Sequence, residues 1–472
     1  MTAGISAAPS HPATRRQALV AITAAAFILL IPVLLNGFPF VFPDSGDYLV
    51  FTPHLYRSPY YGLFIFFFHW NRFIWATVVA QALIVGHLLW LTLALHGVRR
   101  LSPAAIALAA LLCVFSSLPF FVGFIMADLF TAIMFIVMYL IGFHYAELSP
   151  PLRFYLILLG AVAMAAHVAN LAMAIALLCP MTVLLFWCRI PRAEILKRLG
   201  ILAVPIGLTT AAVLLFNIAI FGVLSLAPAA PDFLLANLIE SGPARVYLDK
   251  ACPQAGYKIC AYAGRLPKTA EELLWSSGIF GKLGSFAGMR EEARRIVAAT
   301  LDRYPAEVAR VTAAHFVAGL TAHEPAAEFR AANQVPSMTG LLRIKFGPRT
   351  ANAYLASAEM RDTIPHALIR RIDDVAVPVF FFALVGLGLY AAWRGRRREA
   401  SLATVVVCAV LGDTLLCTAL SGVHDRYQAR VTWLLPLAVF VIGFALATGA
   451  ARKMTSERNL RESFSKRHSQ GA

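Results

Sequence analysis

The feature that most constrains this chain is a series of long apolar runs separated by short segments rich in Lys and Arg. A helix needs about 20 apolar residues to cross the hydrocarbon core of a bilayer. Of the 472 residues, 59% are hydrophobic and only 14% are charged, and the mean hydropathy is +0.71. Soluble domains are roughly half apolar and a quarter charged. The composition therefore excludes an ordinary soluble enzyme and predicts an all-α integral membrane protein whose first partner is the lipid bilayer.

The apolar runs predict about ten membrane-spanning helices. Their ranges are 18–36, 73–96, 103–118, 129–145, two short spans within 154–187, 199–226, 375–393, 402–420 and 431–447. Cytoplasmic loops of membrane proteins are enriched in Lys and Arg. Positive charge falls in every loop that this order places inside, from Arg15–Arg16 to Arg394–Arg398. We therefore expect a multi-pass membrane protein with both termini in the cytoplasm and the large polar segment outside.

These spans divide the chain into four parts. They are an N-terminal membrane module (1–226) with an acidic first outside loop (37–72), an extracytoplasmic domain (227–374), C-terminal membrane helices (375–451) and a basic cytoplasmic tail (452–472). Apolar residues at helical spacing predict a largely helical extracytoplasmic domain, in which the glycine-rich stretch 278–288 is a loop or turn. The aromatic stretch 60–70 is short for a span and predicts an interfacial or re-entrant helix.

Cysteine and charge usage narrow the functional classes. Cys252 and Cys260 lie close together in the extracytoplasmic domain, which predicts a disulfide in an oxidising compartment. Lys and Arg exceed Asp and Glu by 41 to 25, but the basic residues cluster beside apolar runs and set membrane orientation. The sequence contains no nucleic-acid-binding module, P-loop, dinucleotide-binding glycine pattern, zinc motif or nucleophile elbow.

The most informative segment follows the first span and reads Phe-Pro-Asp-Ser-Gly-Asp-Tyr, with acids at Asp44 and Asp47. A carboxylate at the edge of a low-dielectric region can have a raised pKa and act as a general base. For Asp47 we favour a helix cap, on a helix that begins near Tyr48. For Asp44 we favour a functional role, because ionisable residues at a membrane edge are usually functional.

Four further polar residues lie at the ends of apolar runs or inside one. Asp128 directly precedes the fourth span, where a helix dipole tolerates it, yet it has no basic neighbour in sequence. His167 and Asn170 occupy an expected outside turn and are weaker candidates for substrate contact. Asp413 lies inside the ninth span, either near a polar cavity or paired with an Arg.

The second informative segment is His424-Asp425-Arg426-Tyr427-Gln428-Ala429-Arg430, between the last two spans. Outside loops are poor in Arg, so two here oppose the orientation rule. Arg426 and Arg430 are four apart and share a helical face suited to an anionic phosphate. Ion pairing with Asp425, Asp44 or Asp128 is an equal alternative, and the two roles can coexist. Arg57 adds a positive charge in the first outside loop.

The order of these motifs resembles the GT-C type membrane glycosyltransferases, close to the dolichyl-phosphate-mannose mannosyltransferase and aminoarabinose-transferase group. The resemblance covers about the first 150 residues and, more loosely, the Arg-Tyr loop near the C-terminus. The matching residues are Asp44, then Arg57-Ser58-Pro59-Tyr60-Tyr61-Gly62-Leu63-Phe64, Gln81-Ala82-Leu83, and Ser116-Ser117-Leu118-Pro119 before Asp128. The chain departs from the family where Asp44-Ser45 replaces an adjacent acidic pair, which leaves the choice of base between Asp44 and Asp47 open.

The resemblance implies a transferase that takes a sugar from a polyprenyl-phosphate donor at the outer face. Asp44 would be the general base, and Asp128 a second acid that orients the acceptor or a divalent metal. Arg426, Tyr427 and Arg430 would hold the donor phosphate, with Arg57 and His424 beside them. The sequence names neither the sugar nor the acceptor, and no other cofactor is implied.

Two other classes of protein remain as alternatives. A transporter or flippase of a lipid-linked or anionic substrate would carry charges deep within several spans. A non-enzymatic membrane scaffold would tolerate exchange of Asp44, Asp128 and Arg426. The glycosyltransferase hypothesis requires these acids and arginines to converge at one end of the helix bundle.

Overall fold

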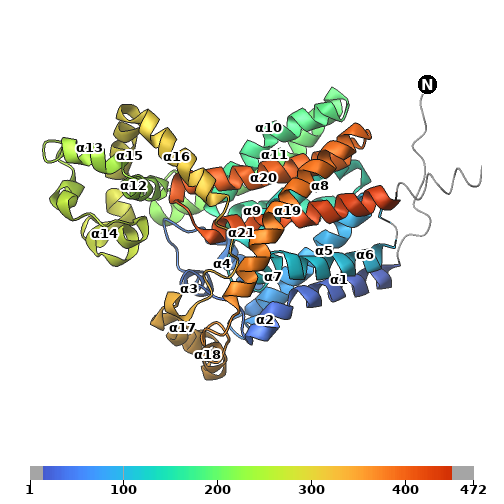
Figure 1. Ribbon diagram of the computed structural model, residues 1–472. Coiled ribbons are helices and arrows are strands. Elements are labelled where there is room, and N and C mark those ends of the chain that lie inside the picture. The colour runs from blue at the N-terminus through green and yellow to red at the C-terminus, as the bar shows by residue number, and fades with distance from the viewer. Residues whose placement is uncertain (1–13, 99, 449–472) are drawn as a thin grey trace, which may run out of the picture.

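The computed structural model describes residues 14–98 and 100–448 and is all-helical, with no β-strand in those two ranges (Figure 1). Within these described residues, seven helices are long and apolar enough to cross a membrane. They are α5 (Trp75–Leu95), α8 (Leu129–His144), α10 (Val168–Trp187), α11 (Arg192–Phe221), α19 (His366–Trp393), α20 (Arg397–Ser421), and α21 (Asp425–Thr432), which leads into a span ending at Thr448. The predicted tail 452–472 lies outside the described residues.

Helices also occupy the other three predicted spans, but they are shorter. These are α1 (Arg15–Leu29), α6 (Leu101–Phe115) and α9 (Pro150–Ala166). Each is followed by a short helix or a sharp break. Pro32 begins α2 (Ile31–Asn36), and an extended backbone at Ser116 separates α6 from α7 (Leu118–Val122). The aromatic stretch forms α4 (Tyr60–His69), a helix as expected.

The bundle is organised around α8. Every residue from Leu129 to His144 is buried, and the helix packs against α9, α10, α11, α20 and α21. In α11 and in α19, only 17% of the most apolar stretch of the helix is buried, so these two helices lie at the periphery of the bundle. A helix that is apolar on all sides and fully buried lies at the centre of its bundle. Asp128, the N-cap residue of α8, is therefore fixed in position by the packing of this helix.

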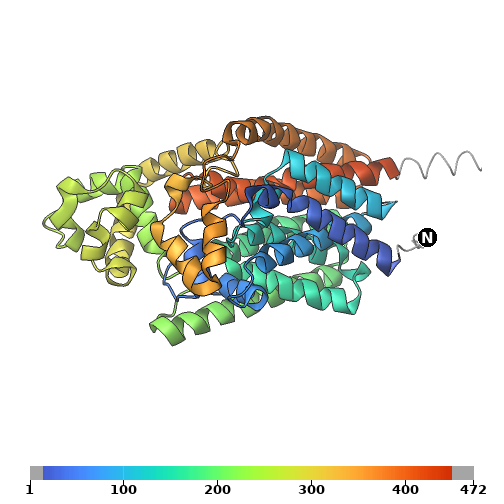
Figure 2. The same cartoon turned by 90° about the horizontal axis from the view of Figure 1, so that it is seen from below.

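The polar region 227–374 divides into two parts, at the same end of the bundle (Figures 1 and 2). The first part has its own apolar core, which includes Leu235, Met289 and Ile296. Its main helices are α12 (Ala230–Glu240), α13 (Pro243–Ala251), α14 (Ile279–Lys282), α15 (Ser285–Arg303) and α16 (Pro305–Gly319). The second part is a hairpin of α17 (Pro336–Phe346) and α18 (Pro348–Leu355), whose buried side chains join the core of the membrane helices.

The predicted loop 278–288 is wrong, because α14 and the start of α15 lie within it. Gly278 and Gly284 adopt φ values of 69° and 98° and act as the N-caps of these helices rather than as loop residues.

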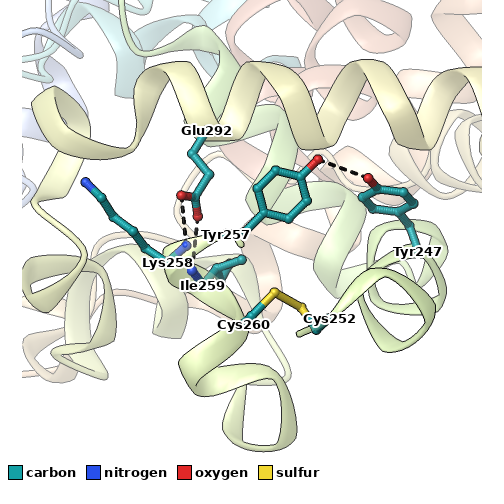
Figure 3. The surroundings of a disulfide bond; sticks show 7 residues. All are labelled: Tyr247, Cys252, Tyr257, Lys258, Ile259, Cys260 and Glu292. Carbon is teal, nitrogen blue, oxygen red and sulfur yellow. Dashed lines mark hydrogen bonds between the residues drawn. A yellow bond between two sulfur atoms is a disulfide. The ribbon is translucent and has the colours of Figure 1, made fainter. Parts of the chain in front are cut away.

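The first part contains the predicted disulfide between Cys252 and Cys260 (Figure 3). Beside it, the Glu292 carboxylate accepts the backbone N–H groups of Lys258 and Ile259 at 2.9 and 3.0 Å. The covalent bond and the carboxylate together fix the 252–260 loop against α15.

Candidate functional site

Acids and arginines from four distant stretches of the chain converge at the end of the bundle that carries the polar region. Asp44 precedes α3 (Ser45–Val50), and Asp128 precedes α8. Arg57 lies in the loop before α4, while Arg426 and Arg430 lie on α21. The breaks after α2 and before α8 and α21 bring these short segments to one place. The charged side chains form two layers. The outer layer is partly exposed and contains Arg57, Asp44 and Asp47, and the inner layer is completely buried and contains Arg430 and Asp413.

Arg57 organises the outer layer. Its Nη2 lies 2.8 Å from Asp44 Oδ1, and its Nε lies 2.9 Å from Asp47 Oδ2. The Asp44 and Asp47 side chains are 30% and 28% exposed. The predicted cap by Asp47 is wrong, because α3 begins at Ser45 with Asp44 at the N-cap position and Asp47 in its first turn. The Asp47 carboxylate instead pairs with Arg57 and lies 3.4 Å from His54 Nε2.

Arg426 joins the outer layer to the inner layer. Its Nη2 lies 3.9 Å from Asp44 Oδ2, and its Nε lies 3.9 Å from Asp128 Oδ1. The guanidinium lies over the rings of Phe42 and Tyr427, at 4.6 and 5.5 Å from their centroids. Its Nε and Nη1 are buried and have no hydrogen-bond partner. Leaving buried donors unpaired is costly, so this guanidinium retains the capacity to bind an anion.

Arg430 forms the inner layer with Asp413. Arg430 Nη2 lies 2.7 Å from Asp413 Oδ1, and Nε donates to Oδ2 at 3.2 Å. Both side chains are completely buried. Arg430 Nη1 also lies 3.4 Å from Asp128 Oδ1. Of the two interpretations open for Asp413, pairing with an Arg is the one the structure bears out. Arg430 is engaged by two carboxylates and shielded from solvent, so only Arg426 of this pair is placed to meet a phosphate.

The charge environment of Asp44 differs from the expectation for a general base. Burial would raise the pKa of its carboxyl group, but the guanidinium groups of Arg57 and Arg426 outweigh burial and hold the pKa below its usual value. Burial alone would lower the pKa of Arg57, but Tyr48 and then the carboxylates of Asp44 and Asp47 raise it above its usual value. The two arginines therefore hold Asp44 in its ionised form.

His167 and Asn170, at the start of α10, have different surroundings. Asn170 is fully buried, accepts from Thr131 at 2.9 Å and donates to the Ala163 carbonyl at 2.8 Å, so it ties α8 to α9 rather than contacting a substrate. His167 is half-buried, and its Nδ1 accepts from the Ala169 N–H at 3.3 Å. Burial, with Arg430 and Arg426 nearby, lowers the pKa of His167 to about 3. His167 is thus neutral near pH 7, with its proton on Nε2.

The other residues of the 424–430 segment fix α21. Asp425 accepts the backbone N–H of Glu324 at 3.0 Å and forms no ion pair with either arginine. Tyr427 lies beneath both guanidinium groups. His424 is exposed, and its ring meets the Tyr427 ring edge to face at 5.1 Å.

Buried hydrogen bonds of Tyr61, Gln81 and Ser117 fix the positions of the segments that carry the site. Tyr61 donates to Gln81 Oε1 at 2.8 Å, and Gln81 Nε2 donates to the carbonyls of Val122 and Phe124 at 2.9 and 3.1 Å. Ser117 donates to the Ala429 carbonyl on α21. These buried bonds connect α4 and α5 to the segment that carries Asp128, and that segment to the arginine helix.

Glu328 is a further acid near the site that sequence reasoning missed. It lies in the 320–335 segment between α16 and α17, where its neighbour Phe329 stacks on Phe40 at 4.3 Å. Burial raises the pKa of Glu328, Arg426 opposes this effect, and the Asp128 charge adds to it. A single Glu in a polar stretch carries no local signal, because its proximity to Arg426 arises only from the tertiary fold.

The donor set does not fit a divalent metal. Over residues 14–98 and 100–448, no group of three His, Cys, Asp or Glu side chains is arranged to hold a metal ion. Asp44, Asp47 and Asp128 each face arginines at 2.8 to 3.9 Å, and this positive charge opposes a bound metal ion, although Asp128 Oδ2 itself is buried without a partner.

Comparison with known proteins gives no relative: no family model, no curated protein and no solved structure matches the chain.

Proposed function

We propose that this protein is a glycosyltransferase that uses a polyprenyl-phosphate-linked sugar at the outer face of a bacterial inner membrane. The observation that carries the proposal is the meeting of Asp44, 30% exposed, with Arg426, which has two buried N–H groups without partners. An acid able to accept a proton and a cation able to bind a phosphate are the two groups that such a reaction needs.

In this proposal the donor phosphate binds Arg426 and is supported by Arg57. Both side chains are nearly buried, at 12% and 11% exposed. Charge-assisted bonds in such surroundings are strong. The bound phosphate pairs with Arg57 and Arg426 and so weakens their ion pairs with Asp44. With less positive charge to neutralise it, the Asp44 carboxylate becomes a better proton acceptor.

The reaction is a displacement at the anomeric carbon. The acceptor hydroxyl oxygen forms a bond to that carbon as the bond to the phosphate oxygen breaks, and the electron pair of the broken bond stays on the phosphate. The hydroxyl proton passes to Asp44, and Arg426 neutralises the charge that develops on the leaving phosphate. Attack opposite the leaving group inverts the configuration of the sugar.

Arg430, Asp413 and Asp128 serve as positioning residues. Asp128 lies within 3.9 Å of both arginines of α21, and its side chain is 2% exposed. It orients Arg426 from the buried side while Arg430 is held by Asp413. In a ten-span arrangement with both termini inside, this cluster lies on the extracytoplasmic side, where a lipid-linked donor needs no nucleotide site.

A transporter of an anionic lipid is the second candidate, and the buried Asp413–Arg430 pair favours it, because charges inside spans often mark transport pathways. Transport would move the lipid between leaflets without breaking the bond between sugar and phosphate. Release of polyprenyl phosphate from its sugar therefore separates the two candidates.

The experiment is turnover by purified protein with a panel of polyprenyl-phosphate sugars, measured as released polyprenyl phosphate. We expect turnover by the wild type and loss of at least 100-fold in Asp44→Asn, as is typical for removal of a general base. Asp249→Asn, an exposed acid in α13, is the matched control and should retain full turnover. Full turnover in Asp44→Asn would remove the proposed base.

A further inference from the structure

The α17–α18 hairpin exposes apolar side chains beside positive charges. Ile344 is 84% exposed, and Leu355 is 45% exposed. Single exposed apolar residues are normal on protein surfaces, but here they accompany Arg343, Lys345 and Arg349 on the same short hairpin. Between residues 335 and 358 the sequence contains no Asp or Glu. The hairpin therefore carries a charge of +3 with nothing of its own to neutralise it.

The opposite side of the hairpin is anchored in the membrane module. Met338, Leu342 and Tyr354 are buried in the core that the membrane helices share. The Tyr354 ring packs against Phe38 at 5.6 Å, directly after α2. Because one face is fixed in this way, the face with Ile344 is held outward rather than free to fold back.

The hairpin lies next to the aromatic end of α4. Phe346 meets the ring of His69 at 5.2 Å, and the neighbouring Phe67, Trp70 and Phe73 are each about 60% exposed. Exposed aromatic side chains that flank apolar helices are typical of the boundary between a bilayer and water. Figures 1 and 2 show the hairpin beside the ends of α2 and α3, at the flank of the bundle.

We propose that the α17–α18 hairpin docks on an anionic phospholipid surface, the outer leaflet around the protein. Ile344 inserts among the lipid tails, and Arg343, Lys345 and Arg349 contact the headgroup phosphates. Apolar and basic residues in one short amphipathic helix are the pattern of interfacial binding. Each cation near an anionic surface strengthens binding about 5-fold, so three contribute on the order of 100-fold.

Docking has a consequence for the acidic segment. A Cβ placed on Gly46 would lie 3.6 Å from Leu341 Cδ1 and 3.7 Å from Met338 Cε, so α17 packs on the first turn of α3, beside Asp44 and Asp47. A lipid-bound hairpin thus holds α3 at the bilayer surface. The lipid contact itself needs no catalytic activity, and it can be tested without a sugar donor.

The test is hydrogen–deuterium exchange of the 336–355 backbone in the full-length protein, in nanodiscs of phosphatidylcholine with or without phosphatidylglycerol. We expect exchange at least 10-fold slower in the anionic discs, and loss of that difference in the triple variant R343Q/K345Q/R349Q. The control K282Q/R294Q/R310Q removes three cations from α14, α15 and α16 and should keep it. Equal exchange of the wild-type hairpin in both discs, or an unchanged difference in the triple variant, would overturn the proposal.

Discussion

The buried ion pair between Asp413 and Arg430 makes a sharp prediction about stability. Both side chains are 0% exposed, and Nη2 lies 2.7 Å from Oδ1. Removing one partner of such a pair leaves an uncompensated buried charge, which costs about 3–5 kcal/mol. In Asp413→Asn, Arg430 keeps its contact with Asp128 at 3.4 Å. We therefore expect a loss near the lower limit, about 3 kcal/mol.

The assay is unfolding in mild detergent by titration with dodecyl sulfate, followed by tryptophan fluorescence. The control is Glu291→Gln, which breaks a pair of similar length: Arg294 Nη2 lies 3.0 Å from Glu291 Oε2, but the two side chains are 70% and 60% exposed. Exposed pairs contribute roughly 0–1 kcal/mol. The two variants thus separate the effect of burial from the effect of distance.

A double variant distinguishes loss of the pair from general damage. Replacing both partners by apolar residues, as in Asp413→Leu with Arg430→Met, removes the buried charges together and should recover most of the stability lost in Asp413→Asn. If Asp413→Asn lowers the free energy of unfolding no more than Glu291→Gln does, Asp413 and Arg430 do not form a desolvated ion pair. The proposed positioning role of this pair then fails as well.

Two further predictions concern the polar region. Cys252→Ser opens a disulfide whose cysteines are 8 residues apart, and loop-closure entropy predicts a loss of about 2.5 kcal/mol in unfolding free energy. The loss is measured by denaturant titration against the oxidised wild type, and reductant-treated wild type should lose the same amount. For Glu328, burial raises the folded-state pKa above the unfolded value, so its contribution to stability is present at low pH and is lost as pH rises through the folded pKa. E328Q should therefore lose less stability than the wild type as pH rises above 4.5, the ordinary pKa of a glutamate, and parallel curves would show that the carboxyl group is not desolvated.

Much of the helical architecture could be predicted from the sequence, because apolar run length is set by the bilayer. Seven long apolar helices lie where runs were expected, and shorter helices occupy the other three positions. The short ones could not be separated from full spans, since sequence does not show where a break such as the one at Ser116 ends a helix. The prediction for 278–288 missed the two helices there because glycine, which favours loops, is equally suited to a helix N-cap, the role of Gly278 and Gly284.

The candidate site was only partly predictable. The spacing of Arg426 and Arg430 correctly indicated one helix, but it could not show that one helical turn separates a side chain that is 12% exposed from one that is completely buried. The partner of Arg430 is 17 residues away on α20, and the partner of Asp47 lies in the following loop, so neither pair leaves a local pattern. Capping propensity favoured a wrong role for Asp47 because it ignores competition from an ion pair.

Affinity for polyprenyl phosphate tests the central claim most directly, because it isolates the phosphate site from the unknown sugar and acceptor. Arg426 has unpaired buried donors, whereas Arg430 is sealed by Asp413. Loss of a charge-assisted bond of about 1.5–3 kcal/mol predicts that Arg426→Gln binds on the order of 10- to 100-fold more weakly than the wild type. Arg294→Gln, which removes a 70% exposed arginine of α15, should bind as the wild type does. Equal affinity of Arg426→Gln and the wild type would contradict the account.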